Sequence, residues 1–95
     1  MRCRLDEAGL QAQLARYGEL GRHVDGVRRG PRLLEVDFGR GVDAELLQRA
    51  MAIERECCPF FELSYEEGSG RLSITVEDPG HDAALDAIRF ALTPG

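Results

Sequence analysis

The chain has 95 residues, of which 43% are hydrophobic and 31% charged, and its formal net charge is -5. This length predicts a single domain spanning residues 1–95 with one core, and the composition excludes disorder for most of it. The acidic balance disfavours nucleic-acid binding, which usually needs a basic stripe, and no apolar stretch is long enough to cross a bilayer.

A first helix is predicted between an N-cap at Asp6 and Gly21, which stands just past its end. Leu10, Leu14 and Tyr17 follow the i, i+4, i+7 spacing of one helical face. These three side chains are therefore expected to pack against the rest of the domain.

A hairpin is predicted next, from His23 to Phe38, around a turn at residues 28–31. In its second strand Leu34 and Val36 alternate with acidic residues, which indicates one core face and one solvated face. Arg28 and Arg29 fall at the tip of this hairpin, so we expect them in a solvated loop.

The second helix is predicted to begin at the N-cap Asp43. Its apolar stripe consists of Leu46, Ala50, Ile53 and Cys57, widened by Leu47 and Met51. Pro59 disfavours helical geometry at the residue before it. Cys57 should therefore lie in the last turn, and Cys58 at or just past the helix end.

A second hairpin follows, in which apolar residues alternate with polar ones on both sides of a turn at residues 67–70. Asp82 then opens a last helix. The order α-β-β-α-β-β-α predicts an α+β fold, a four-stranded antiparallel sheet with helices packed on one face.

The vicinal pair Cys57 and Cys58 is the most informative feature for function. Adjacent cysteines are poor partners for a disulfide, because the small ring distorts the bond. Three cysteines in a chain without a secretory signal indicate a cytoplasmic protein with free or metal-bound thiols. Cys3 can supply a third sulfur if the start of the first helix lies beside the end of the second.

Three sulfurs would suit mercury(II), arsenic(III) or copper(I), because soft thiolates select soft ions. Zinc(II) normally needs a fourth ligand, for which His23, His81 and Glu54 are the candidates. The two histidines are expected to be exposed turn residues. Glu54 is expected at a solvated helix end. No organic cofactor is indicated.

The position of the cysteines disfavours enzymatic chemistry. A helix C-terminus with Glu54 and Glu56 nearby should raise thiol pKa values, whereas a nucleophilic or redox cysteine needs a lowered pKa. A soft cation brings compensating charge and deprotonates its own ligands. The alternative is that the cysteines are inert core residues of a structural or interaction module, such as a homodimer or a regulator-docking domain.

The segment from Glu56 to Leu63, preceded by the helix from Leu46 and followed by a strand at residues 71–76, resembles a group of small, largely uncharacterised bacterial proteins. An E-x-C-C-P-F signature recurs in that group, and an early Cys-x-Leu, here Cys3-Arg4-Leu5, precedes a first amphipathic helix. The resemblance implies a metal(loid)-binding accessory role in heavy-metal resistance of the mercury or arsenic type, with Cys3, Cys57 and Cys58 as ligands.

Overall fold

The computed structural model describes residues 7–92. Its helices are α1 (Glu7–Gly21), α2 (Ala44–Cys57) and α3 (Asp82–Leu92), with the short 3₁₀ turn η1 (Pro79–His81) before α3. Its strands are β1 (Val24–Gly30), β2 (Leu33–Phe38), β3 (Phe61–Glu66) and β4 (Arg71–Val76). The predicted order of elements and the α+β class are confirmed.

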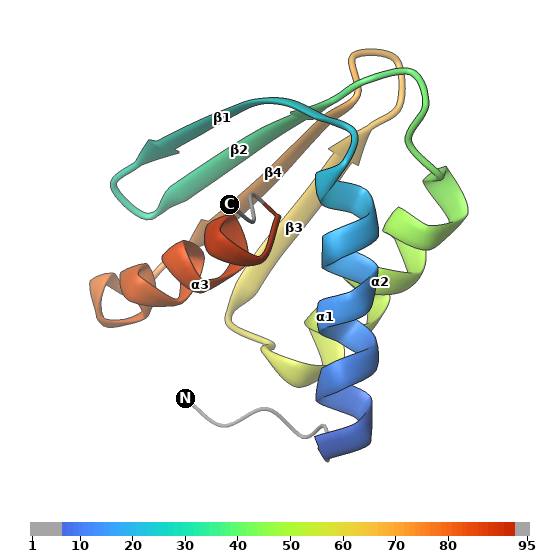
Figure 1. The fold of residues 1–95 in the computed structure, drawn as a ribbon. Coiled ribbons are helices and arrows are strands. Elements are labelled where there is room, and N and C mark those ends of the chain that lie inside the picture. Colours follow the sequence, from blue (N-terminus) through green and yellow to red (C-terminus); the bar gives the residue numbers. More distant parts are fainter. Residues whose placement is uncertain (1–6, 93–95) are drawn as a thin grey trace.

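The four strands form one antiparallel sheet in the order β1-β2-β4-β3. Each hairpin therefore contributes one central strand, and β2 and β4 pair at the middle of the sheet, with Leu34 opposite Ile74. The three helices lie on one face of this sheet (Figure 1). None of the helices within residues 7–92 combines the length and apolar character needed to span a bilayer.

The core lies between the sheet and the helices. Residues that alternate along the two central strands are buried toward it: Leu34, Val36, Phe38, Leu72, Ile74 and Val76. This alternation confirms the strand pattern read from the sequence. The hydrophobic effect supplies the driving force, because each of these side chains is almost fully removed from water.

The other face of the sheet carries charged side chains. Asp37 on β2 forms an ion pair with Arg28 on β1 (2.9 Å) and another with Arg71 on β4 (2.9 Å). Hydrogen bonds from these two guanidinium groups lower the pKa of Asp37 to about 2. The charges link three neighbouring strands across the solvated face.

The tip of the first hairpin differs from its prediction. Arg28 and Arg29 belong to β1, and the turn falls later, where Arg32 adopts a positive φ of 57°. The guanidinium of Arg29 pairs with Asp82 (2.9 Å) and Asp86 (3.0 Å) of α3. The solvated-loop expectation is wrong for Arg29, because the last helix packs beside this hairpin and supplies two carboxylates.

The N-cap of α2 is confirmed. The Asp43 side chain accepts hydrogen bonds from the backbone N–H groups of Glu45 (3.0 Å) and Leu46 (3.1 Å). The buried face of the helix is shifted from the predicted stripe, since Leu46 and Ile53 are only half-buried. The buried residues are Leu47, Ala50, Met51, Glu54 and Cys57.

Helix α1 also turns a different face inward. Leu10 and Leu14 are 45% and 47% exposed, and of the predicted stripe only Tyr17 is buried. Gln13 and Leu20 are buried with it. The reason is tertiary: α1 packs against both α2 and α3, and the groove between α1 and α3 leaves the two leucines partly open.

Candidate metal site at the C-terminus of α2

Cys57 ends α2 and Cys58 is its C-cap, as the sequence predicts. The backbone N–H of Cys58 donates to the carbonyl of Glu54 (2.7 Å), and its carbonyl accepts from the N–H of Phe61 (3.0 Å). The two cysteines are 5% and 1% exposed. The end of α2 and the start of β3 thus hold the pair inside the protein.

Glu54 lies beside the two cysteines. One carboxylate oxygen and the two sulfur atoms all lie within 4.8 Å of one another, and all three residues are buried. The expectation of a solvated helix end is wrong for Glu54, which is 7% exposed. Helix α1 lies over this last turn of α2 and removes it from water, an effect that local sequence does not encode.

Two side chains of α1 satisfy the buried carboxylate. The Tyr17 hydroxyl donates a hydrogen bond to Oε1 of Glu54, and Nε2 of Gln13 approaches the same oxygen at 3.4 Å. Nε2 of Gln13 also donates to the carbonyl of Ala50 (2.9 Å). Buried polar groups are costly without such partners. Burial and the adjacent carboxylate raise the pKa of Tyr17 far above its ordinary value, so the phenol remains a donor.

Burial raises the pKa of the Cys58 thiol to about 12. The negative charge of Glu54 and a hydrogen bond with its carboxylate contribute to the same rise, after burial. The direction agrees with the sequence analysis, but burial, which the sequence did not reveal, is the largest cause. A thiol in this state is a weak nucleophile at neutral pH, which argues against nucleophilic or redox catalysis by Cys58.

The two adjacent cysteines differ in oxidation state. Cys57 is disulfide-bonded. Cys58 keeps its thiol, so the pair does not form the strained vicinal disulfide that the sequence analysis disfavoured. The expectation of reduced thiols throughout is not met at Cys57. Cys3, the predicted third sulfur, lies outside the described residues.

Neither histidine joins this cluster. His81 was expected to be exposed, but it is half-buried and its ring stacks on that of Phe60 at a centroid distance of 4.0 Å. Its Nδ1 is buried without a hydrogen-bond partner among residues 7–92. His23 lies in the turn before β1 and is half-buried. Of the three candidates for a fourth ligand, only Glu54 is brought to the cysteines.

A cavity of about 150 Å³ opens above the thiol, between α1 and α3. We call it the α1–α3 groove. Leu10 and Leu14 line it from α1, and alanines on one face of α3 line the opposite side. Tyr17, Glu54 and Cys58 also line it, whereas Cys57 does not. The groove therefore combines apolar walls with one carboxylate and one sulfur.

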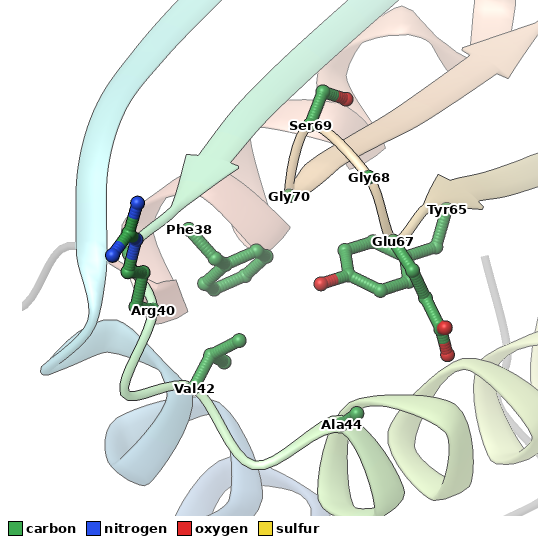
Figure 2. Close-up of a pocket in the computed structure, with 10 residues that line it drawn as sticks. Phe38, Arg40, Val42, Ala44, Tyr65, Glu67, Gly68, Ser69 and Gly70 are labelled. Carbon is green, nitrogen blue, oxygen red and sulfur yellow. The ribbon is translucent and has the colours of Figure 1, made fainter.

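A second cavity, of about 490 Å³, lies at the opposite end of α2. Phe38, Val42 and Tyr65 point into it, and Glu67 stands at its side next to the start of α2 (Figure 2). Although this cavity is larger, neither cysteine nor histidine lines it. The chemistry of the sequence motif is therefore concentrated at the α1–α3 groove and not here.

Comparison with protein-family models, with curated proteins and with solved structures found no match. The motif itself also departs from the E-x-C-C-P-F signature, because Arg55 occupies the position two residues before the first cysteine. Glu54 and Glu56 flank that position.

Proposed function

We propose that this protein binds a thiophilic metal or metalloid ion through Cys57 and Cys58, with Glu54 as an oxygen ligand. The candidate ions are mercury(II), arsenic(III), copper(I) and zinc(II). The observation that supports the proposal is the convergence of two sulfur atoms and a carboxylate oxygen within 4.8 Å in a buried setting. Soft ions favour thiolates, and this donor set offers two.

The charges at this site favour binding of a metal cation over nucleophilic catalysis by the thiols. Hydrogen bonds satisfy the Glu54 carboxylate while the thiols are protonated, but thiolates beside it are unfavourable unless positive charge compensates them. A metal ion supplies that charge and deprotonates the thiols that bind it. The raised pKa of Cys58 keeps the thiol unreactive in the metal-free protein, and it does not prevent metal binding, since the ion displaces the proton.

Metal binding at both cysteines requires the reduced protein. A thiolate is the ligand, so the disulfide at Cys57 must first be opened. Cys3 remains the proposed third sulfur. A site that holds one ion in the reduced protein and loses a ligand on oxidation would serve sequestration or transfer of that ion to a partner.

Native mass spectrometry of freshly reduced protein tests the proposal. The protein is exposed in turn to mercury(II), arsenite, copper(I) and zinc(II), and we expect one ion per chain with at least one of them. Cys57→Ser and Cys58→Ser should each weaken binding, and the double variant should abolish it. Glu56→Gln, which changes an exposed neighbour, is the matched control. Unchanged uptake by the double variant would exclude this function.

An interaction module is the second candidate, and one observation favours it. Phe90 on α3 is 79% exposed, so a partner surface could bury a large aromatic side chain there. Under this alternative the protein forms a homodimer or docks on a regulator, and its cysteines are inert. Sedimentation of the metal-free reduced protein should then show a stable dimer that Phe90→Ser dissociates, with no ion bound.

A further inference from the structure

We infer that the α1–α3 groove takes an organic derivative of the soft ion, a metal cation that already carries one hydrocarbon group, with Cys58 as its sulfur ligand. The inference rests on the proposed function, because it assumes that this site captures soft ions. Its new content is the chemical form of the bound ion, which carries a hydrocarbon group. The observation behind it is the joining of a buried thiol to an apolar groove of a defined size.

The walls of the groove argue against a hydrated ion as its occupant. Leu10 and Leu14 of α1 face Ala84, Ala87 and Ala91 of α3 across it. The alanines recur at i, i+3 and i+7, so they share one helical face and leave room that larger side chains would fill. Contact with these apolar walls does not stabilise an inorganic ion. It stabilises a hydrocarbon group, because transfer of such a group from water to apolar surroundings is favourable.

The size of the groove sets the size of the hydrocarbon. Its volume is about 150 Å³. An apolar cavity of about this volume accommodates a benzene ring. A phenyl group therefore fits, and a methyl group would leave most of the space empty.

The number of sulfurs that face the groove sets the coordination. Cys58 lines the groove and Cys57 does not. An organomercury(II) cation is linear and has one position left beside its carbon ligand, so a single thiolate completes it. A monoorganic arsenic(III) species needs two sulfurs, which this groove does not present. The geometry therefore favours the mercury type of cation.

The binding step is a ligand exchange without redox change. In R–Hg–X, where X is a halide, a carboxylate or a small thiolate, the Hg–X bond breaks and X leaves with its electron pair. The S–H bond of Cys58 breaks and a Hg–S bond forms. The proton passes to the Glu54 carboxylate, which is already hydrogen-bonded to this thiol, and from there to solvent.

Phenylmercury(II) acetate is the probe, and competition with glutathione is the measurement, because any accessible thiol binds such a reagent to some extent. The partition of the probe between protein and glutathione is followed by mass spectrometry. We expect Cys58→Ser to lose the bound probe and Cys57→Ser to retain it. Methylmercury(II) chloride should be held less tightly than the phenyl compound.

Groove filling provides the decisive pair of variants. Ala87 lines the groove and Ala83 does not, although both alanines are exposed on α3, so Ala87→Leu fills the groove and Ala83→Leu is its matched control. Ala87→Leu should shift the partition of phenylmercury toward glutathione by on the order of tenfold, as expected when a ring loses apolar burial, and Ala83→Leu should not. Equal retention by both variants, or methyl held as tightly as phenyl, would overturn the inference.

A parallel titration of the same variants distinguishes failure of the proposed function from failure of this inference. Inorganic mercury(II) is titrated in parallel into reduced protein, where its binding depends on Cys57 and Cys58 together. If mercury(II) is bound but groove filling has no effect on phenylmercury, the site captures inorganic ions and the inference fails alone. If the Cys57, Cys58 double variant takes up mercury(II) as the unmodified protein does, the proposed function fails.

Discussion

Tyr17 on α1 donates a hydrogen bond to the carboxylate of Glu54 on α2, a residue 37 positions further along the chain. This contact joins two helices directly above the thiol of Cys58. It has a structural role, since it satisfies a buried carboxylate, and it borders the candidate site, since both residues line the α1–α3 groove. Substitutions at Tyr17 and at Glu54 separate these roles.

Tyr17→Phe removes the hydroxyl donor and keeps the ring. Glu54 then stays buried with one good partner fewer, and we expect the free energy of unfolding to fall by about 1–3 kcal/mol. Urea denaturation at pH 7 measures the change. Tyr65→Phe is the control, because the hydroxyl of Tyr65 makes no hydrogen bond within the part of the chain that the structure describes. Equal stability of the two variants would contradict the buried hydrogen bond.

Glu54→Gln keeps an oxygen acceptor for Tyr17 but removes the negative charge beside Cys58. The charge and hydrogen bond of Glu54 raise the pKa of this thiol, so the variant should have a pKa below about 12. The rate of alkylation by iodoacetamide at Cys58, followed by peptide mass spectrometry against pH, reports the shift. Glu56→Gln, an exposed neighbour, should leave the profile unchanged. A profile that moves to higher pH would disprove the electrostatic account.

The buried Cys58 thiol predicts a loss of stability in alkaline solution. Its pKa is raised from 9.0 in the ordinary thiol to about 12 in the folded protein, so the folded state favours the neutral form. The resulting stabilisation is complete below about pH 9 and is lost as the pH rises toward 12. Urea denaturation of reduced protein between pH 7 and pH 10.5 should show this decline. Cys58→Ala should decline less steeply, and a parallel decline would assign the effect to other groups.

Gly70, in the turn between β3 and β4, is a position where only glycine fits. Its φ is +72°, and a Cβ there would stand 2.6 Å from the carbonyl oxygen of Phe38. Gly70→Ala should lower the free energy of unfolding by at least about 1–2 kcal/mol, since left-handed backbone alone costs this much for an alanine. Gly68→Ala meets no atom within 4 Å and serves as the control. Thermal or urea denaturation compares the two, and equal effects would contradict the close contact.

The helix and strand pattern could be predicted because it depends on near neighbours along the chain. Asp43 caps α2 through backbone N–H groups two and three residues ahead. The alternation along β2 and β4 follows from the geometry of a strand with one buried face. For the same reason the sequence placed Cys57 in the last turn of α2 and Cys58 at its end.

The surroundings of these residues could not be predicted, because they come from elements distant in the sequence. Glu54 was expected in water and is buried by Tyr17 and Gln13 of α1. Arg29 was expected in a solvated loop and is held by Asp82 and Asp86 of α3. In each case the local pattern is compatible with exposure, and only the packing of another helix decides the outcome.

The sequence by itself determined the α+β architecture and the position of a vicinal cysteine pair at a helix end, because hydrogen-bonding caps and hydrophobic periodicity act over a few residues. Only the tertiary structure decided that a carboxylate joins the sulfurs and that the histidines do not. It also decided that one of the two cysteines lines an apolar groove. Those properties depend on how α1 packs against α2 and α3, and helix packing depends on side chains throughout the core.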